Sequence, residues 1–225
     1  DTEGVVVSHD ADTAVLMTWY RNNVVHVLAT PALIACLIVN RRRPLGLAEL
    51  HSLVAAVSPY IGDELSYAFD SADTGRWINH MVEAGLITKR DDTLTPRRDD
   101  LTRQVELRLL ANTIMPTLER FYITAALLAQ SPQAPLTRDY VLERARAIAE
   151  RLSKLYGLNA PEFFDPYLFE GFVQSLQQRG VVHQDDDGHL QISDEIPALL
   201  RAARPVISTD VQQTVAREGN GAFIG

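Results

Sequence analysis

Two stretches of the sequence repeat one pattern, and this repetition constrains the fold more than any other feature. Residues 77–85 have helical periodicity and end in glycine, and two short apolar runs then flank the turn at Asp91 and Asp92. Residues 172–180 also end in glycine, and two apolar runs again flank an Asp-rich turn, at 185–188. A helix closed by glycine and followed by two apolar runs around a turn predicts a helix plus a β-hairpin. The chain is therefore expected to contain two such units.

A further helix is expected ahead of each hairpin. Before the first hairpin, apolar residues recur at helical spacing, namely Leu50, Leu53, Val54 and Val57. Before the second they recur after Thr137, a suitable N-cap, and these are Leu142, Ala145, Ala149, Leu152 and Leu155. The combination predicts two winged-helix-like units.

The segment that connects the two units, residues 101–128, is helical by pattern, and Pro116 predicts a kink in it. The expected inner stripe of this segment is Leu110, Ile114, Leu118, Phe121 and Ala125. Beyond Ile207 the sequence becomes polar and rich in glycine, which predicts a tail whose last residues are loosely held.

The N-terminal segment opens with a β-branched run in residues 4–8, which predicts a short strand. A helix should follow as far as Ala29, with Leu16, Tyr20, Val24, Val27 and Leu28 on its inner side. Pro31 should break or kink this helix, and a second apolar helix at 32–39 should end before the cations at 41–43. The apolar run is shorter than the roughly 18 residues of a membrane-spanning candidate. A buried helix pair is therefore favoured, with peripheral membrane contact as the alternative.

The predicted fold class is mainly α with small β-hairpins, a helical module with two winged-helix-like units and no transmembrane span. An apolar content of 46% supports a packed core. The predicted division of the chain is an entry strand and helical segment at 1–44, a first unit at 45–100, connecting helices at 101–134, a second unit at 135–205 and a tail at 206–225.

The charge of the chain works against nucleic acid as a partner. The 29 acidic residues outnumber the 21 Lys and Arg, giving a formal net charge of −8, which disfavours broad attraction to phosphate backbones. The single cysteine, Cys36, lies among apolar residues and is expected to be buried. The His, Cys, Asp and Glu spacing matches no metal site, and neither a phosphate loop nor a dinucleotide fingerprint is present in the sequence. No metal or cofactor is therefore expected.

Two blocks of the sequence, residues 15–23 and residues 151–165, resemble the C-terminal region of bacterial membrane-associated glycerol-3-phosphate 1-O-acyltransferases. Residues 15–23 end in Tyr20-Arg21-Asn22-Asn23, which is similar to a block that follows the acyltransferase domain in that family. Residues 151–165 resemble a second block of the same proteins. The resemblance implies an accessory region that packs against an upstream acyltransferase domain of the same polypeptide, at the cytoplasmic face of the bacterial inner membrane.

The resemblance also implies a reaction for the whole polypeptide, the transfer of a fatty acyl group from acyl carrier protein or coenzyme A to the sn-1 hydroxyl of glycerol 3-phosphate. In that family a His with an Asp five positions later acts as base and orienting carboxylate, and a Glu-Gly motif followed by Arg and Ser binds the substrate phosphate. Here His189 with Asp194, and Glu170 with Gly171, match only fragments of those motifs and in reversed order. The catalytic pair is therefore expected upstream, and this chain alone should be inactive.

Seven residues are candidates for contacts outside the chain. The guanidinium fork of Arg21 suits a substrate phosphate or a carboxylate across the domain boundary, and Tyr20, Asn22 and Asn23 lie beside it. For Asn23, a structural hydrogen bond competes with substrate contact. The other three are Arg41, Arg42 and Arg43, which with Arg97 and Arg98 form a basic cluster. That cluster fits solvated helix caps, an anionic lipid surface or acidic acyl carrier protein.

The alternative function is that of a winged-helix regulator that binds nucleic acid. Such a fold presents basic and polar residues on a recognition helix. The candidate helices are nearly neutral, with Asn79, His80 and Glu83 in one and Gln174, Gln177 and Arg179 in the other. Both hairpin turns carry aspartates where phosphates would lie, so the acyltransferase interpretation is preferred.

Overall fold

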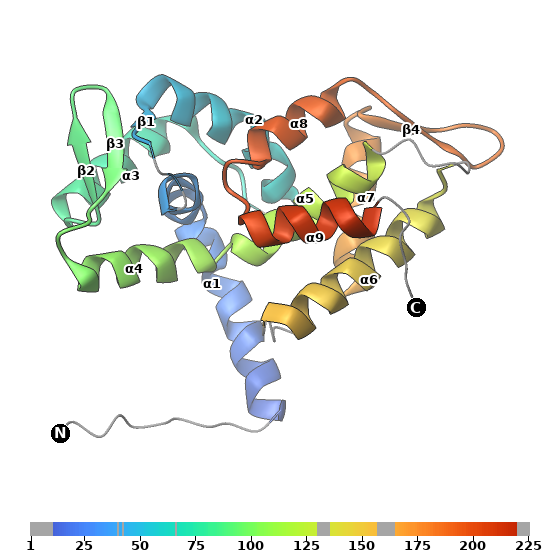
Figure 1. Cartoon of the computed structure of the whole chain (residues 1–225), viewed down its shortest axis with the longest axis horizontal. Helices are drawn as coiled ribbons and strands as arrows, with labels where there is room; N and C mark the ends of the chain where they lie inside the picture. The colour runs from blue at the N-terminus through green and yellow to red at the C-terminus, as the bar shows by residue number, and fades with distance from the viewer. Residues whose placement is uncertain are drawn as a thin grey trace.

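The described part of the chain forms a mainly helical structure with two small antiparallel sheets (Figure 1). The computed structural model describes residues 11–39, 41, 43–65, 67–129, 136–156 and 165–219, and for residues 11–23, 71 and 219 it describes the backbone alone. The first half contains α1 (Ala11–Val39), β1 (Leu45–Gly46), α2 (Leu47–Leu65), α3 (Ser71–Glu83), β2 (Ile87–Arg90), β3 (Thr93–Pro96) and α4 (Leu101–Asn112). The second half contains α5 (Met115–Leu128), α6 (Arg138–Tyr156), α7 (Pro166–Gln178), β4 (Val182–Gln184), β5 (Leu190–Ile192), α8 (Glu195–Ala203) and α9 (Thr209–Gly219).

Both predicted helix-plus-hairpin units are present, and their helices end in the same way. Gly85 after α3 and Gly180 after α7 adopt positive φ angles of 72° and 70°. After α3, the N–H of Leu86 donates to the carbonyl oxygen of Met81, and after α7 the N–H of Val181 donates to that of Leu176, both at 2.9 Å. This is the bonding pattern of a Schellman motif, which satisfies the last carbonyls of a helix and turns the chain into the following strand.

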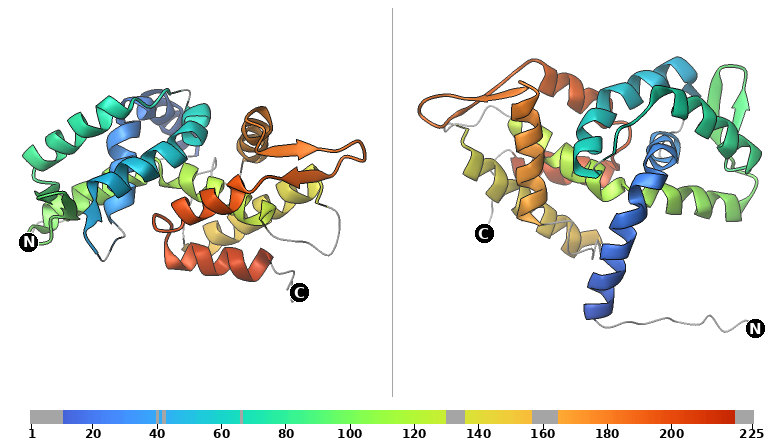
Figure 2. Two further views of the ribbon diagram at one scale, coloured as in Figure 1. Left: turned by 90° about the horizontal axis from the view of Figure 1, so that it is seen from above. Right: turned by 180° about the vertical axis from the view of Figure 1, so that it is seen from behind.

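The repetition extends to the segment ahead of each helix pair. In the first unit β1 precedes α2 and pairs with β3, giving a three-stranded sheet in the order β1-β3-β2. In the second unit Thr137 precedes α6 and forms an isolated bridge with His189, next to β5. The two hairpins lie at opposite ends of the long axis of the molecule (Figures 1 and 2). The classification of the units as winged-helix-like stays a prediction.

One hydrophobic core joins the two units. Tyr60 of α2, Phe121 of α5 and Phe172 of α7 form an aromatic cluster, in which the ring centroids of Phe121 and Phe172 are 4.7 Å apart and those of Tyr60 and Phe121 are 5.6 Å apart. Close tilted and edge-to-face pairs of this kind add packing energy beyond the area that they bury. The two repeats therefore share one hydrophobic core and do not form separate domains.

Helix α1 differs from the expected pair of helices, because it continues through Pro31. Residues 32–38 are buried all around and α1 contacts α2, α3 and α4, so packing on both sides of the proline holds the helix together. The ribbon of α1 changes direction along its length, in keeping with a kink (Figure 1). The expected strand at 4–8 lies outside the described residues. None of the helices in the described part of the chain has both the length and the hydropathy needed to cross a bilayer.

Several details of the predicted helices need correction. The inner side of α1 is occupied by Val25, at 4% exposure, whereas Val24 and Val27 are 54% and 58% exposed. The connector is two helices, and Pro116 lies in the first turn of α5, where its missing N–H costs no helical bond. Leu155, expected on the inner face of α6, is 58% exposed because it lies beyond the buried face that ends at Leu152.

The range predicted as a tail contains helix α9. Val211 and Val215 of this helix are buried, and α9 contacts α5 and α6. The carboxylate of Glu218, near its end, lies 2.5 Å from the guanidinium of Arg151. The helix was not predicted because the segment is mostly polar and only two buried valines, spaced one helical turn apart, mark its inner face. The last residues, 220–225, lie outside the described range.

Candidate anion-binding pocket

Three segments of the first unit meet at the β2–β3 hairpin and carry arginines to one place. Because Leu45 of β1 pairs with Leu94 of β3, the residues just before β1 run alongside the end of β3. Strand β2 ends at Arg90, and the chain leaves β3 through Arg97 and Arg98. Together with Arg43, these residues line an open pocket of about 770 Å³.

The floor of the pocket is the polar face of the hairpin. Ile87 and Leu94 point into the core, at 2% and 1% exposure. The alternating residues take the other face, where Thr88 is paired with Thr95 and Arg90 with Thr93. The register of the hairpin therefore places three threonines and one arginine together on the side that lines the pocket.

The pocket has an excess of positive charge. Nε of Arg97 donates to Oδ1 of Asp99 at 3.0 Å, and this hydrogen bond lowers the pKa of Asp99. Within the described part of the chain, Arg43, Arg90 and Arg98 have no carboxylate partner. Four guanidinium groups thus face one carboxylate, in a chain whose formal net charge is −8. Such a cleft attracts anions.

The threonines of the pocket differ in their hydrogen bonding. The hydroxyl of Thr93 donates to the carbonyl oxygen of Arg90 at 2.9 Å and so braces the turn. Among the described residues, the hydroxyls of Thr88 and Thr95 make no hydrogen bond. These two hydroxyls lie on directly paired residues and can donate together to a ligand on the hairpin face.

The residues predicted from the sequence fall into three groups. Arg43, Arg97 and Arg98 come together in the pocket. Arg41 does not join them, because its Nη1 lies 2.7 Å from Oε1 of Glu49 on α2 and its side chain is only 14% exposed. Arg42 lies outside the described residues. Tyr20, Arg21, Asn22 and Asn23 lie on α1, but their side chains are outside the described part of the structure.

Arg90 belongs to the pocket and was not among the predicted site residues. Its position two residues after Thr88 on β2 gives both residues the same face of the strand. The alternation of residues between the two faces of the hairpin could therefore have identified Arg90, if it had been used for the polar face as well as for the apolar face.

A second set of charged residues joins the two units, and two of its members, Asp63 and Arg179, also line an open pocket of about 570 Å³. Arg179, which directly follows α7, binds Asp63 of α2 through two nitrogens, with Nη2 at 2.9 Å from Oδ1 and Nε at 3.1 Å from Oδ2. The hydroxyl of Ser175 also donates to Asp63, and the Arg179 guanidinium lies 5.4 Å from the centroid of the Tyr60 ring. The Asp63 carboxylate and the Arg179 guanidinium already bind each other, which favours a structural role for this pair.

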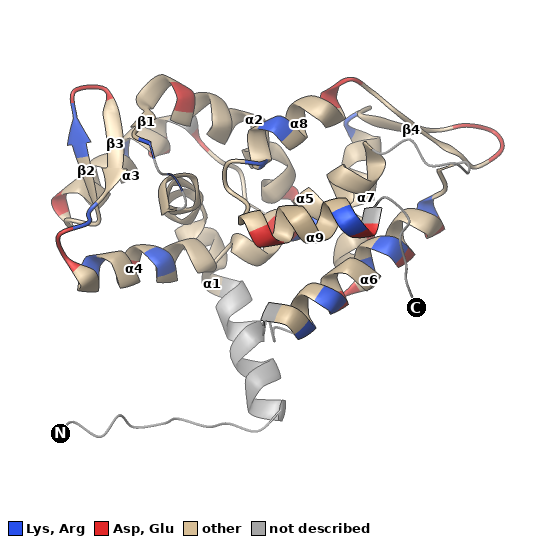
Figure 3. Ribbon diagram, viewed as in Figure 1, with Lys and Arg blue, Asp and Glu red and all other residues tan. Residues whose placement is uncertain are grey.

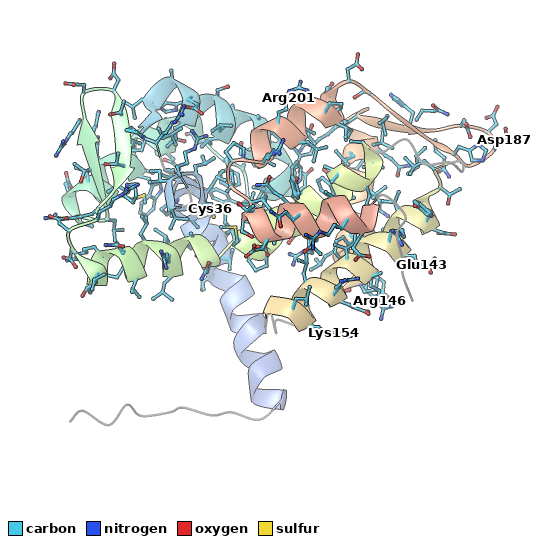
Figure 4. The ribbon with its side chains drawn as sticks, in the orientation of Figure 1. Cys36, Glu143, Arg146, Lys154, Asp187 and Arg201 are labelled. Atoms are coloured by element: carbon cyan, nitrogen blue, oxygen red, sulfur yellow. The ribbon has the colours of Figure 1, made fainter. Side chains whose placement is uncertain are left out.

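Two ionisable groups are buried near the junction of α1, α4 and α5. Burial raises the pKa of Glu119 to about 7, and the neighbouring Arg120 opposes this shift. Burial also raises the pKa of Cys36 strongly, with a smaller contribution from Glu119, and its Sγ donates to the carbonyl oxygen of Ala111 at 3.2 Å. The thiol lies inside the first half of the molecule (Figure 4). A protonated, buried thiol is a poor nucleophile.

The motif fragments rejected in the sequence have structural partners of their own. His189 lies at the second hairpin with its Nδ1 at 3.6 Å from Oδ2 of Asp185, and not beside Asp194 as a catalytic pair would require. Glu170 of α7 binds Arg138 of α6 at 2.7 Å. The described residues also contain no group of three or more His, Cys, Asp or Glu side chains placed to hold a metal ion.

Comparison with known proteins places these features in a family context. Residues 1–185 match the family model described as the glycerol-3-phosphate acyltransferase C-terminal region. The chain is 38% identical over 220 residues to the glycerol-3-phosphate acyltransferase of Pseudomonas putida strain GB-1, with 96% of this chain and 26% of that protein covered. It is 36% identical to the proteins of the same name from Pseudomonas entomophila strain L48 and Pseudomonas aeruginosa strain UCBPP-PA14, with the same coverage. The chain thus spans about a quarter of the length of these relatives.

Proposed function

The chain belongs to the family of glycerol-3-phosphate acyltransferase C-terminal regions, and from this membership we propose that it is the accessory part of such an enzyme. The whole polypeptide transfers a fatty acyl group from acyl carrier protein or coenzyme A to the sn-1 hydroxyl of glycerol 3-phosphate. The His–Asp pair that deprotonates this hydroxyl lies in the upstream acyltransferase domain. The observation that carries the proposal is the coverage of only 26% of each relative by 96% of this chain.

The accessory role is packing against the upstream domain. Two exposed apolar groups support it. On α1 these are Val24, Val27 and Leu28, and on α4 they are Leu101, Val105 and Leu109, which recur every fourth residue. Leu101 and Leu109 are 79% and 64% exposed, and large apolar side chains grouped in this way on a helix favour a protein partner. The upstream domain is the proposed occupant, because about three quarters of each relative's length lies outside the region that this chain matches.

The second part of the proposal is contact with an anionic partner through the basic cluster. Arg43, Arg97 and Arg98 line one pocket, which suits the anionic surface of the cytoplasmic face of the inner membrane. Each basic residue near such a surface contributes about 1 kcal/mol of attraction. Acyl carrier protein, which is acidic, is the competing partner for the same arginines.

Acyl-transfer assays test whether catalysis requires the upstream domain. The 225-residue chain and the full polypeptide should be incubated with glycerol 3-phosphate and either acyl thioester, and the acylated position should be determined in the product. We expect sn-1 acylation by the full polypeptide alone. Turnover by the 225-residue chain would refute the accessory role.

A substitution of Arg21 tests the contact between this region and the upstream domain. In the full polypeptide, Arg21→Ala should lower activity, because a guanidinium fork suits either the substrate phosphate or a carboxylate of the upstream domain. A raised KM with an unchanged melting temperature would indicate phosphate contact, and a lowered melting temperature would indicate domain contact. Wild-type kinetics together with a wild-type melting temperature would remove Arg21 from the interface.

A further inference from the structure

We propose that the pocket beside the β2–β3 hairpin is a phosphate-binding site, in which Arg43, Arg90 and Arg98 bind the oxygens of a phosphate group. This inference deepens the anionic contact of the proposed function and rests on it only for the source of the phosphate. Binding itself is independent of acyl transfer, so it can be measured on the 225-residue chain, and its failure would leave the accessory role standing.

The three arginines reach the pocket from three different segments. Arg43 precedes β1, Arg90 ends β2 and Arg98 follows β3. The antiparallel register of all three strands fixes these segments relative to one another. Donors that approach from separate backbone segments surround a ligand, whereas three arginines on one exposed helix face would lie in a row.

The charges of this pocket are open to a ligand. Each of the three arginines is exposed and, within the described residues, lacks a carboxylate partner. Like charges held in one cleft repel each other, and an anion that binds between them removes this repulsion. Arg97 differs from the other three because Asp99 already neutralises it.

The number and kind of donors favour phosphate over carboxylate. A guanidinium group presents a planar fork of N–H donors, and three forks need more acceptor oxygens than the two of a carboxylate. A phosphate offers three or four oxygens in a tetrahedral arrangement. The hydroxyls of Thr88 and Thr95, which make no hydrogen bond to any described residue, add two donors from the floor of the pocket. The Cβ atoms of such an antiparallel pair are about 5 Å apart.

Asp99 sets the affinity of the site. Its carboxylate is the acidic group that lines the pocket, and it accepts a hydrogen bond from Arg97 at 3.0 Å. A bound phosphate is repelled by this carboxylate and attracted by the arginine that it neutralises. Replacing Asp99 by Asn should therefore strengthen phosphate binding.

The size of the pocket admits a phosphate ester as well as free phosphate. Its volume of about 770 Å³ lies within the range of small-molecule sites, about 300 to 1,000 Å³. The same arginines can thus hold the headgroup phosphate of a lipid or the phosphate of a soluble ester. Both sources share one recognition chemistry and differ in whether the ligand is part of a membrane.

Titration with inorganic phosphate tests the site. We expect the Kd of the 225-residue chain to rise about threefold for each of Arg43→Gln, Arg90→Gln and Arg98→Gln, and about thirtyfold for the triple variant. Asp99→Asn should lower the Kd about threefold. Arg108→Gln on α4 is the matched control, because Arg108 is also exposed, has no ion-pair partner among the described residues and lies outside the pocket. A triple variant with the wild-type Kd, or a control as damaging as the pocket variants, would overturn the proposal.

Vesicles identify the source of the phosphate. The wild-type chain, the triple variant and the Arg108→Gln control should be sedimented with vesicles of phosphatidylcholine alone and of phosphatidylcholine with phosphatidylglycerol. Binding to the anionic vesicles that the triple variant loses and the control keeps assigns the site to a lipid headgroup. Equal sedimentation of all three chains, with phosphate titration still sensitive to the triple variant, assigns it to a soluble phosphate ester. Insensitivity of both measurements to the triple variant would refute the site.

Discussion

The two hairpins of this chain follow the same kind of helix end and differ in the charges that their strands carry. Each follows a helix that ends in a glycine with a φ angle near 70°, and each directs alternate residues into the shared core. Both turns carry aspartates, at 91–92 in the first hairpin and at 185–187 in the second (Figure 3). The first hairpin also carries Lys89 and Arg90 on β2, whereas residues 182–192 of the second contain no Lys or Arg. Asp187 marks the far end of this second hairpin (Figure 4).

This difference distinguishes the residues that the fold requires from the surface residues that can vary. The glycines, the helix caps and the inward-facing apolar residues are needed for both hairpins to form and pack. The outward-facing residues are free of that requirement and carry the chemistry. Two copies of one structural unit can therefore differ in function, with one hairpin face that binds a ligand and one that faces only solvent. The ligand-binding face is expected where charged side chains lack ion-pair partners.

The largest expected effect comes from breaking the core that the two units share. Phe172→Ala removes the α7 ring that contacts Phe121, and we expect the free energy of unfolding to fall by about 3 to 5 kcal/mol in urea titrations. Tyr167→Ala on the same helix is the control, since its side chain is 79% exposed and should change stability by less than about 0.5 kcal/mol. Two separate unfolding transitions in the wild-type chain would show that the units do not share one core.

The next largest effect concerns the buried carboxyl of Glu119. Because burial raises its pKa from 4.5 to about 7, the folded chain binds more protons than the unfolded chain between these values, and stability falls as pH rises across that window. Glu119→Gln should therefore raise the free energy of unfolding at pH 8 by on the order of 3 kcal/mol, and change it little at pH 4.5.

Urea titrations at the two pH values measure this difference for Glu119→Gln. Glu143→Gln on α6 is the control, because Glu143 is exposed and should leave stability unchanged at both pH values. Equal effects of Glu119→Gln at pH 8 and pH 4.5 would contradict the raised pKa.

A smaller effect is expected from the ion pair that ties α2 to α7. A double-mutant cycle with Arg179→Gln and Asp63→Asn should give a coupling energy of about 1 kcal/mol, since the pair is bidentate but partly exposed. The matching cycle on Arg146 and Glu150 within α6 should give about 0.3 to 0.5 kcal/mol. A larger coupling energy for the α6 pair would contradict the prediction that the ion pair between the two units is the stronger one.

The smallest effect is predicted for the acidic hairpin. Replacing Asp185, Asp186 and Asp187 together by Asn should leave the Kd for inorganic phosphate within about twofold of wild type. The hairpin should keep its shape, because an Asn at position 185 can still accept the hydrogen bonds that Asp185 takes from the N–H groups of Asp187 and His189, at 3.1 and 2.8 Å. A tenfold gain in phosphate affinity would mean that overall charge governs binding rather than the first hairpin.

The sequence predicted the features that depend on local patterns. Both helix-plus-hairpin units follow from a glycine and two apolar runs, which specify a helix end and a turn without reference to the rest of the chain. Thr137 was predicted as an N-cap for the same reason, and its Oγ1 accepts a hydrogen bond from the N–H of Tyr140 at 3.3 Å. The resemblance to the acyltransferase C-terminal region was likewise recognised from two short, contiguous blocks, and the family model matches residues 1–185.

Features that depend on distant contacts were missed. Pro31 was expected to break or kink its helix, and the sequence did not decide between the two; α1 continues through Pro31 with a kink, packed by α2, α3 and α4 (Figure 1). Arg41 and Arg43 looked equivalent, but the side chain of Arg41 is held by Glu49 and that of Arg43 is not. Arg90 entered the pocket through strand register, which pairs it with Thr93. Helix α9 was not predicted, because most of its residues are polar and only its two buried valines indicate an inner face.

The most direct test of the contrast between the hairpins is an NMR titration of the ¹⁵N-labelled chain with inorganic phosphate. We expect concentration-dependent shifts of the backbone N–H groups within 43–46 and 88–99, apart from Pro44 and Pro96, which have none, and unchanged N–H groups at 182–192. Shifts of comparable size at both hairpins, or at the second hairpin alone, would contradict it.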